Sequence, residues 1–189
     1  MTDKKNAKDI IIKAASRLFR TRGYYGVGLN EILKESGTAK GSLYYYFPNG
    51  KEELAIAAID YTKEFVADKI RRALEKFEEP IQAFQAHIND LSEEFGVHKE
   101  IFGLPIGTIA GETSLTSEPI RLACQSAFEC WQLIYVEKLL ASGYSEKHAK
   151  ELGLLINAML EGGILLCLTT KSREPLRIIA EQIPFLLKK

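Results

Sequence analysis

The fold of this chain is decided by residues 29–54, which read LNEILKESGTAKGSLYYYFPNGKEEL. A short helix is expected over residues 30–36, because Gly37 follows it and suits the left-handed backbone that ends a helix. A second short helix is expected over residues 39–47, with Thr38 as its N-cap. Two short helices joined by so tight a turn form a helix-turn-helix, which places the start of its second helix in the major groove of DNA.

The second helix has one apolar face and one polar face. Leu43 and Phe47 are four residues apart, so both side chains can pack on the first helix. The remaining positions offer cations and hydroxyl groups to phosphates, and tyrosine rings to sugars and thymine methyl groups. The candidate DNA-binding residues are Asn30, Thr38, Ala39, Lys40, Gly41, Ser42, Tyr44, Tyr45, Tyr46 and Lys51. Any one of them alone could be a packing side chain or a solvated charge, and it is their combination at this spacing that favours DNA binding.

The chain before this stretch also reads as a helix. Residues 7–22 carry apolar side chains at the spacing of one helix face, and Gly23 follows them. Tyr24 and Tyr25 are expected to close the core of the small N-terminal domain. At the other end, Pro48 stops the second short helix because its ring cannot continue the hydrogen-bond ladder.

These segments together resemble the TetR family of transcriptional regulators. The family signature is an apolar helix that ends in Phe and Gly, a short helix, the pattern G-x-x-K-G-[ST]-L-Y-x-[YH]-F, and then K-E-E-L. The matching residues are Phe19, Gly23, Gly37, Lys40, Gly41, Ser42, Leu43, Tyr44, Tyr46, Phe47 and the run Lys51-Glu52-Glu53-Leu54. The match covers roughly the first quarter of the chain and is highly specific.

Two positions depart from the common pattern. Gly28 stands where many members have threonine, and Asn30 stands where many have arginine. Asn30 can still hydrogen-bond the edge of an adenine. The segments Gly28-Leu29-Asn30 and Pro48-Asn49-Gly50 are similar to the LmrA/YxaF-like branch of the family. The resemblance implies a repressor that pairs through its two C-terminal helices and loses affinity for DNA when a small molecule binds.

Charge is distributed unevenly along the 189 residues. The composition, 46% apolar and 26% charged, is typical of a soluble globular protein, and the formal net charge is zero. Residues 1–50 nevertheless hold nine Lys or Arg against four Asp or Glu, a net charge of +5, so the rest of the chain carries −5. A basic N-terminal segment on an acidic body is the pattern expected of a DNA-binding protein.

The cysteines give no sign of a metal site or a disulfide. Cys124, Cys130 and Cys167 form no CxxC, and no cysteine–histidine cluster has zinc spacing, so no metal and no cofactor is expected. No signal peptide is recognised, and the apolar run at residues 162–168 is too short to cross a membrane. These features predict a cytoplasmic protein with reduced thiols and no membrane partner.

Beyond residue 50 the chain again reads as helices, with hardly any strand alternation. They are expected over residues 51–77, 80–95, 118–141, 145–169 and 174–187. The first follows the helix-turn-helix without a flexible linker, and Tyr61 and Phe65 are expected on its buried face. The predicted fold is all-α with about nine helices. A helix-turn-helix DNA-binding domain occupies residues 1–50, and a larger helical ligand-binding and dimerisation domain occupies residues 51–189.

The last two helices carry more apolar side chains than one buried face needs. They are Leu152, Leu155, Ile156, Met159, Leu160, Ile164, Leu168, Ile178, Ile179, Ile183, Leu186 and Leu187. A helix that is apolar nearly all round must be buried on both sides, and a partner chain can cover the second side about a two-fold axis. An unusually large core in a monomer is the alternative.

A ligand pocket is expected among the central helices. Residues 102–112 are rich in glycine and form a poor helix by themselves, so their movement could open an apolar pocket beside large soft side chains. The candidate ligand-binding residues are Phe65, Phe84, His87, Phe102, Ile106, Ile109, Phe128, Trp131, Tyr135 and Met159. Gln132, Asn157 and Glu161 are further polar candidates. Each residue alone is more commonly part of a core. The resemblance implies a small effector, often planar and apolar.

These observations predict a homodimeric, ligand-responsive repressor that binds a palindromic operator in double-stranded DNA. An enzyme of all-helical type is one alternative. No nucleophile–base pair, metal set or phosphate loop appears, however, and His87, His98 and His148 are scattered. A dimerisation scaffold without DNA contact is another, and the basic N-terminal segment speaks against it.

Overall fold

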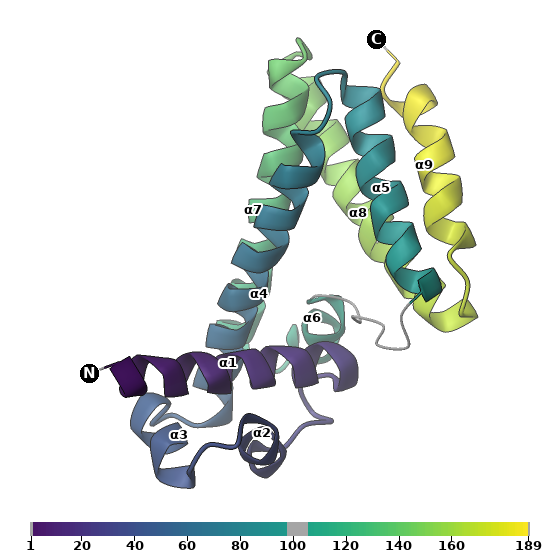
Figure 1. The fold of residues 1–189 in the computed structure, drawn as a ribbon. Helices are drawn as coiled ribbons and strands as arrows, with labels where there is room; N and C mark the ends of the chain where they lie inside the picture. The colour runs from purple at the N-terminus through teal and green to yellow at the C-terminus, as the bar shows by residue number, and fades with distance from the viewer. Residues whose placement is uncertain (1, 98–105, 189) are drawn as a thin grey trace. The chain divides into compact units, whose positions relative to one another are not determined.

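The computed structural model describes residues 2–97 and 106–188 of the chain. In this part the chain forms nine helices and no strand, which confirms the predicted all-α class (Figure 1). The helices are α1 (Thr2–Arg22), α2 (Leu29–Ser36), α3 (Lys40–Tyr46), α4 (Lys51–Leu74), α5 (Pro80–Val97), α6 (Gly107–Thr113), α7 (Glu118–Ala141), α8 (Glu146–Thr170) and α9 (Glu174–Leu186). Phe102, one of the predicted ligand-binding residues, lies outside the described residues.

The helix boundaries follow local signals in the sequence. Gly23 and Gly37 have φ of 74° and 63°, the left-handed backbone expected directly after α1 and α2. Ser145 caps α8, since its hydroxyl accepts a hydrogen bond of 3.3 Å from the amide of His148. The largest difference is at the start of α1, which begins at Thr2 and not near residue 7.

The chain divides into two compact units. Unit 1 comprises Met1–Glu64 and Pro105–Ala127, and unit 2 comprises Phe65–Leu104 and Phe128–Lys189. Two helices, α4 and α7, therefore contribute residues to both units. These units describe packing, and the functional boundary expected at residue 50 stays a prediction.

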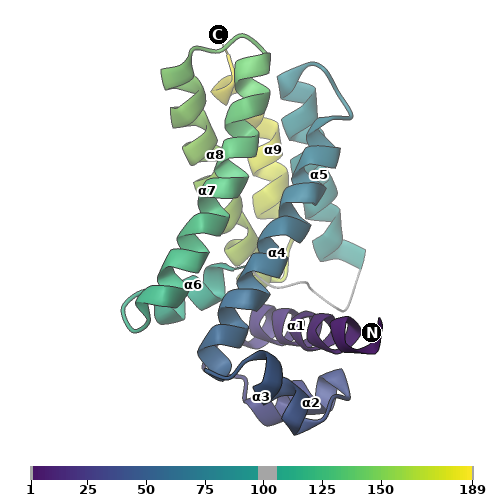
Figure 2. The ribbon, with the colours of Figure 1, turned by 90° about the vertical axis from the view of Figure 1, so that its left-hand side faces the viewer.

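In unit 1, α1 lies across α2 and α3 and packs on both (Figures 1 and 2). Ile11 and Phe19 of α1 are fully buried, as are Ile32 of α2 and Leu43 of α3. The apolar residues of each helix recur every three or four positions, so each presents one face to a shared core. This core fixes the direction in which the opposite face of α3 points.

The buried face of α4 agrees with the expected helical pattern at Leu54, Ala58 and Ile70, which are buried, and differs from it at two aromatic positions. Tyr61 and Phe65, which were expected on it, are 37% and 43% exposed. Ala55, Ile59 and Thr62 are buried in their place. The prediction gave too much weight to aromatic size, whereas a small residue is needed where the Thr62 hydroxyl approaches that of Ser16 at 2.8 Å in a buried hydrogen bond.

In unit 2, α9 packs on both α5 and α8 (Figure 2). A Cβ atom added at Gly163 of α8 would lie 2.6 Å from Ile179 Cδ1 and 3.0 Å from Leu176 Cδ2 of α9. The glycine therefore permits a close approach of the two helices. Gly162, its neighbour, is exposed and has no atom within 4 Å of such a Cβ position. The glycine pair thus faces two ways, one residue toward α9 and one away from the core.

One helix of the described residues, α8, is long and apolar enough by length and composition alone to cross a membrane. The expectation that no apolar span is long enough to cross a membrane is therefore not met by α8 on length and composition. In the structure, 44% of the apolar window of α8 is buried inside the chain, and α8 packs on α9.

Candidate nucleic-acid interface

The second helix of the helix-turn-helix, α3, starts one residue later than predicted. Its N-cap is Ala39, with an extended backbone and no hydrogen bond from a side chain. The prediction of Thr38 as N-cap was therefore wrong. The Thr38 hydroxyl lies 2.7 Å from the hydroxyl of Ser36 instead, and this bond is made within the turn between α2 and α3.

The two faces of α3 separate as the sequence predicts. Leu43 is fully buried, and Phe47 directly after the helix is buried as well. The opposite face is open: Lys40 and Gly41 are exposed, and Tyr45 is 69% exposed. A cation, a residue without a side chain and a large aromatic hydroxyl therefore face outward from one short helix. This arrangement suits contact with phosphates, backbone and base edges of DNA.

Neighbouring aromatic side chains extend this surface. Tyr44 is 45% exposed, and the Lys40 ammonium lies 5.9 Å from the centroid of its ring. Tyr46 is half-buried and meets Tyr45 edge-on, with ring centroids 5.0 Å apart. Ser42 is half-buried beside them. Four of the predicted DNA-binding residues thus surround Tyr45 on one helix.

The start of α2 is held by the Glu31 carboxylate, through one hydrogen bond from the backbone and one ion pair. Glu31 Oε2 accepts a hydrogen bond of 2.9 Å from the amide of Gly28, and Glu31 Oε1 accepts one of 2.7 Å from Arg22. The hydrogen bond from Gly28, followed by that from Arg22, lowers the pKa of the Glu31 carboxyl. Asn30, a predicted DNA-binding residue, is exposed next to Glu31. Its backbone is therefore fixed while its side chain is accessible.

Lys51 occupies a different environment from Lys40. Its ammonium lies 4.3 Å from the centroid of the Tyr24 ring, and the residue is half-buried. This burial lowers the pKa of Lys51, and the nearby Glu112 carboxylate partly opposes the shift. The Lys51 side chain is thus held against the Tyr24 ring inside unit 1.

The residues just before α2 are partly on the surface. Tyr24 packs on Phe19, with ring centroids 5.9 Å apart, but Tyr25 is 60% exposed. The expectation that both tyrosines close the core was wrong for Tyr25. Its hydroxyl lies 2.7 Å from that of Thr116, so the ring extends over the surface toward the segment after α6.

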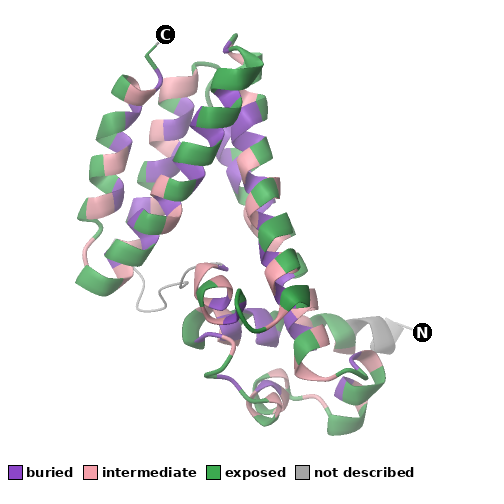
Figure 3. Cartoon of the chain, turned by 180° about the vertical axis from the view of Figure 1, so that it is seen from behind, coloured by how far each residue is buried: buried purple, intermediate pink, exposed green. Residues whose placement is uncertain are grey.

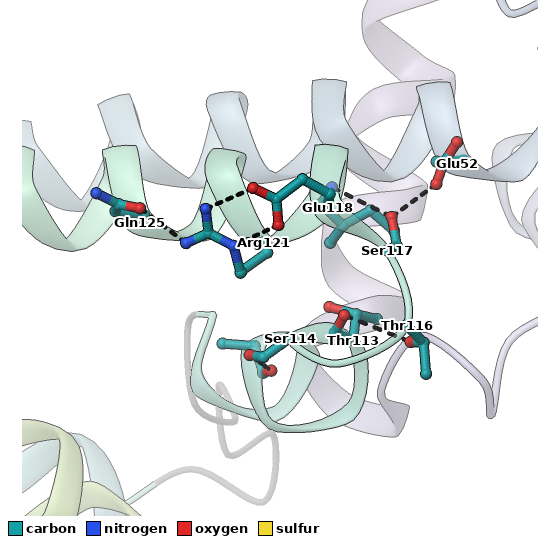
Figure 4. Close-up of polar contacts among 10 residues, drawn as sticks. Glu52, Thr113, Ser114, Thr116, Ser117, Glu118, Arg121 and Gln125 are labelled. Atoms are coloured by element: carbon teal, nitrogen blue, oxygen red, sulfur yellow. Dashed lines mark hydrogen bonds and ion pairs between the residues drawn. The ribbon is translucent and has the colours of Figure 1, made fainter.

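A polar corner at residues 112–117 was not found by sequence reasoning. It comprises the end of α6 and the turn into α7, and Figure 4 shows its serines and threonines. Ser117 donates a hydrogen bond of 2.6 Å to Glu52 of α4, and its hydroxyl accepts one of 3.3 Å from the amide of Ile120 (Figure 4). Ile120 is a local partner, but Glu52 lies 65 residues away in the sequence, so no local pattern reveals this contact.

Part of the predicted ligand-binding set is brought together in unit 2. The rings of Phe84 and Tyr135 have centroids 5.7 Å apart, and the Tyr135 hydroxyl lies 3.4 Å from His87 Nε2. Phe128 and Trp131 meet edge-on, with centroids 5.7 Å apart. Most of these side chains are buried. They form an aromatic cluster that contains a few polar atoms.

The rest of the predicted ligand-binding set is placed differently. Phe65 is 43% exposed on α4, and Met159 is half-buried on α8. Ile106 and Ile109 are buried, but they belong to unit 1. Within unit 2, Phe84 and His87 lie beside Tyr135, so these three residues are better candidates for a ligand site than the whole predicted set.

Burial shifts the titration of the polar groups of unit 2. It lowers the pKa of His87 to about 4, so the ring is neutral at pH 7. Burial, with a smaller contribution from the Glu161 charge, raises the pKa of Tyr135 far above its usual range. Burial also raises the pKa of Glu161 to about 7. At pH 7 this side of unit 2 therefore offers a neutral imidazole and a neutral phenol, while Glu161 is only partly ionised.

The cysteines and other potential metal ligands remain dispersed. All three cysteines are free, and burial raises the pKa of the Cys124 thiol to about 12. Over residues 2–97 and 106–188, no group of three or more His, Cys, Asp or Glu side chains could hold a metal ion.

Exposed positions run along α8 and α9 (Figure 3), and several of them carry large apolar side chains. On α8 the exposed positions repeat at helical spacing as Leu154, Leu155, Ala158, Gly162, Leu165 and Leu166. On α9 they include Ile178 and Phe185, and the latter is 76% exposed. Of the twelve apolar residues predicted to supply this surface, only Leu155 and Ile178 are exposed, so the prediction is met at two positions. Leu154, Leu165, Leu166 and Phe185 are part of this exposed surface, and the sequence prediction had omitted them.

Two family models match the chain. "Bacterial regulatory proteins, tetR family" matches residues 11–58, and "Transcriptional regulator LmrA/YxaF-like, C-terminal domain" matches residues 80–182. Among curated proteins, the uncharacterized HTH-type transcriptional regulator YxaF of Bacillus subtilis is 46% identical over 189 residues, which cover 100% of this chain and 99% of YxaF. The HTH-type transcriptional regulator LmrA of the same organism is 50% identical over 184 residues, 97% of this chain and 98% of LmrA.

Solved structures share the fold. A TetR transcriptional regulator from Chloroflexus aurantiacus superposes with a TM-score of 0.82 at 25% identity, over 98% of this chain and 96% of that one. The reduced form of NemR from E. coli superposes with a TM-score of 0.84 at 22% identity, over 94% of this chain and 95% of that one.

Proposed function

The chain belongs to the TetR family of bacterial transcriptional regulators, with an LmrA/YxaF-like C-terminal domain, and on that premise we propose a homodimeric repressor that a small, largely apolar molecule releases from a palindromic operator. As a member of this family it is a DNA-binding regulator and not an enzyme. It acts on double-stranded DNA, and we place it with the chromosome in the cytoplasm.

The open face of α3 is the observation that carries the proposal. Leu43 and Phe47 bury one side of the helix, so Lys40, Tyr44 and Tyr45 face outward on the other. Lys40 meets a phosphate, and the tyrosine hydroxyls and rings meet phosphates, sugars and thymine methyl groups. Gly41 is exposed with no atom of this chain within 4 Å of its Cβ position, which leaves room for a DNA backbone.

A double substitution tests this role. Lys40→Ala with Tyr45→Ala removes a cation and a large ring from exposed positions, so the fold should persist. Operator affinity is expected to fall by at least about 30-fold, since losses of about 1–3 kcal/mol at two independent contacts add. The operator is first recovered from random DNA with the unmodified protein. Fluorescence anisotropy then measures binding to it.

The matched control changes the same residue types elsewhere. Lys147 is exposed on α8 and Tyr61 is exposed on α4, and neither lies on the helix-turn-helix. The pair Lys147→Ala with Tyr61→Ala is expected to leave operator affinity within about twofold. If the Lys40 and Tyr45 pair also leaves affinity unchanged while the protein stays folded, α3 does not bind DNA as proposed.

Pairing of two chains is supported by the exposed faces of α8 and α9. Leu154 and Leu165 are 57% and 51% exposed, and Ala158 and Gly162 lie between them on the same face. Large apolar side chains flanking small ones let two helices approach closely. We propose that this face of α8, with Ile178 and Phe185 of α9, meets its copy about a two-fold axis.

The effector site is proposed in unit 2. Phe84, His87 and Tyr135 bring two aromatic rings and neutral polar atoms together, which suits a small, mainly apolar molecule with few hydrogen-bonding groups. Phe128, Trp131 and Met159 extend this apolar environment. A library of small molecules, tested for release of the recovered operator, identifies the effector. The substitution Tyr135→Phe then tests whether its hydroxyl contributes to the response.

A further inference from the structure

The Glu112 carboxylate fills a concave group of backbone amides at the end of α1. Its Oε2 accepts hydrogen bonds of 2.5 Å from the amide of Tyr24 and 3.1 Å from that of Tyr25. Gly23 just before them has φ of 74°, and a left-handed residue turns successive amides to one side, where they bind an anion. A Cβ at Gly23 would lie 2.1 Å from Glu112 Oε1, so the carboxylate needs a glycine there.

The same carboxylate interacts electrostatically with the residue that begins α4. Lys51 lies with its ammonium over the Tyr24 ring, and the charge of Glu112 favours its protonated form. Lys51 follows α3 after only four residues. Glu112 therefore binds the segment that precedes the helix-turn-helix and attracts the first residue of the segment that follows it.

Two further hydrogen bonds from the polar corner reach the same two segments. The hydroxyl of Thr116 lies 2.7 Å from that of Tyr25, before α2. Ser117 donates to Glu52, after α3, at 2.6 Å (Figure 4). Within six residues the chain thus carries three polar side chains that hold both flanks of the helix-turn-helix. All of these contacts lie inside unit 1.

We propose that Glu112 is a positioning residue for operator binding, and that with Thr116 and Ser117 it sets the orientation of the helix-turn-helix on α6 and the start of α7. The inference rests on the proposed function. The chain enters the corner from α5 and leaves it along α7, and residues 65–104 and 128–189 belong to unit 2. The corner therefore holds both flanks of the helix-turn-helix through side chains of α6 and of the turn into α7, all within unit 1.

The inference predicts a selective defect. Binding of two heads to a full operator requires both to be oriented correctly, whereas binding to a half-site requires only one. Glu112→Ala should therefore weaken binding to the full operator by about tenfold or more and change half-site binding by less than about twofold. Glu112→Gln keeps the length and one acceptor oxygen, so it should give an intermediate loss.

The experiment compares two DNA duplexes recovered by selection, one with both half-sites and one with a single half-site. Glu118→Gln is the matched control, because Glu118 is an acidic residue next to the corner whose carboxylate pairs with Arg121 of the same helix. Circular dichroism and light scattering confirm folding and oligomeric state. If Glu112→Ala does not fold, the pair Thr116→Val with Ser117→Ala takes its place, with the same expected selectivity.

Three results would overturn the inference. Full-operator affinity could be unchanged in the folded Glu112→Ala protein. Full-operator and half-site affinities could fall equally, which would mean that Glu112 only supports the folding of the head. The control Glu118→Gln could show the same selective loss. Failure of the unmodified protein to select any DNA would instead defeat the proposed function itself, and the inference with it.

Discussion

At the scale of single residues, two buried groups of unit 2 give stability opposite dependences on pH. The pKa of His87 is lowered by burial to about 4. The neutral imidazole therefore contributes to the free energy of unfolding above about pH 6.5, and this contribution is lost as the pH falls toward 4. The pKa of Glu161 is raised by burial to about 7. The protonated carboxyl therefore contributes to the free energy of unfolding below about pH 4.5, and this contribution is lost as the pH rises through 7. Between about pH 4.5 and 6.5 the two slopes oppose each other.

Replacing the Glu161 carboxyl should leave the pH dependence of stability that His87 causes without an opposing effect. Glu161→Gln removes the cost of ionisation inside unit 2, so the free energy of unfolding is expected to rise by about 1–2 kcal/mol at pH 8. From pH 6.5 to 4.5 the variant should lose stability more steeply than the unmodified protein. Urea unfolding at pH 4.5, 6.5 and 8 measures both effects. Glu151→Gln, an exposed change on the same helix, is the control, and identical pH profiles for the Glu161 variant and the unmodified protein would contradict the assignment.

Two left-handed glycines provide a second residue-scale prediction. Gly23 and Gly37 have similar φ values, so alanine should cost about 1–2 kcal/mol of backbone strain at either position. At Gly23 the new Cβ would also displace the Glu112 carboxylate from two amides, whereas at Gly37 it would meet nothing within 4 Å. Gly23→Ala is therefore expected to destabilise by about 1–2 kcal/mol more than Gly37→Ala in thermal unfolding. Equal losses would show that the carboxylate contributes little.

At this scale the sequence was informative about local chemistry and uninformative about distant contacts. Gly37 was predicted to be left-handed because only the chain around it matters. Thr38 was misassigned because its hydroxyl competes between a helix cap and the side chain of Ser36. Glu112 was missed because its partner Tyr24 is 88 residues away, and a single sequence does not show such a pairing.

At the scale of helices, the adjacent glycines of α8 have separate roles. Gly163→Ala places a methyl group against Ile179 and Leu176 of α9, so it is expected to destabilise the chain by about 1–3 kcal/mol through overpacking. Gly162→Ala meets no atom of this chain and improves helix propensity, so it is expected to leave the chain as stable or slightly more so. Thermal unfolding of both proteins makes the comparison. Equal destabilisation would contradict the two-way orientation of the pair.

Helices were predicted most accurately where caps and periodicity agree. The bounds of α7 match those expected, and Ser145 caps α8 as its position before an apolar repeat predicts. The buried face of α4 was wrong for Tyr61 and Phe65, because helical periodicity identifies a stripe but does not fix which of two overlapping stripes faces the core. The contact of Ser16 with Thr62 decides between them in the folded chain.

At the scale of the whole molecule, the exposed stripe of α8 predicts the assembly. Leu165→Glu with Leu166→Glu places two carboxylates on exposed positions, so each chain should still fold. Burying those charges against a partner is costly, and dimers are expected to dissociate to monomers at micromolar concentration. Sedimentation velocity measures the mass. The control Lys147→Glu with Lys150→Glu changes charge outside the stripe, and a double leucine variant that stays dimeric would exclude this face from the interface.

The class of the fold and the position of the helix-turn-helix could be predicted from the sequence, while the two packing units could not. All-helical structure follows from periodicity, and the helix-turn-helix follows from a dense local motif. The grouping of residues 105–127 with the N-terminal helices depends on contacts of Glu112, Thr116 and Ser117 that no pattern in the sequence displays. For the same reason the predicted ligand set is brought together only in part, with Phe84 and His87 beside Tyr135 and with Phe128 beside Trp131.

The central claim is that two copies of α3 read DNA about a two-fold axis, and selection of bound duplexes from random sequence tests it most directly. The account predicts enrichment of an inverted repeat whose half-sites are centred about one helical turn, or a multiple of it, apart. The Lys40→Ala and Tyr45→Ala protein should enrich no such repeat. Recovery of unrelated sequences, or of single sites without inverted symmetry, by the unmodified protein would contradict the claim.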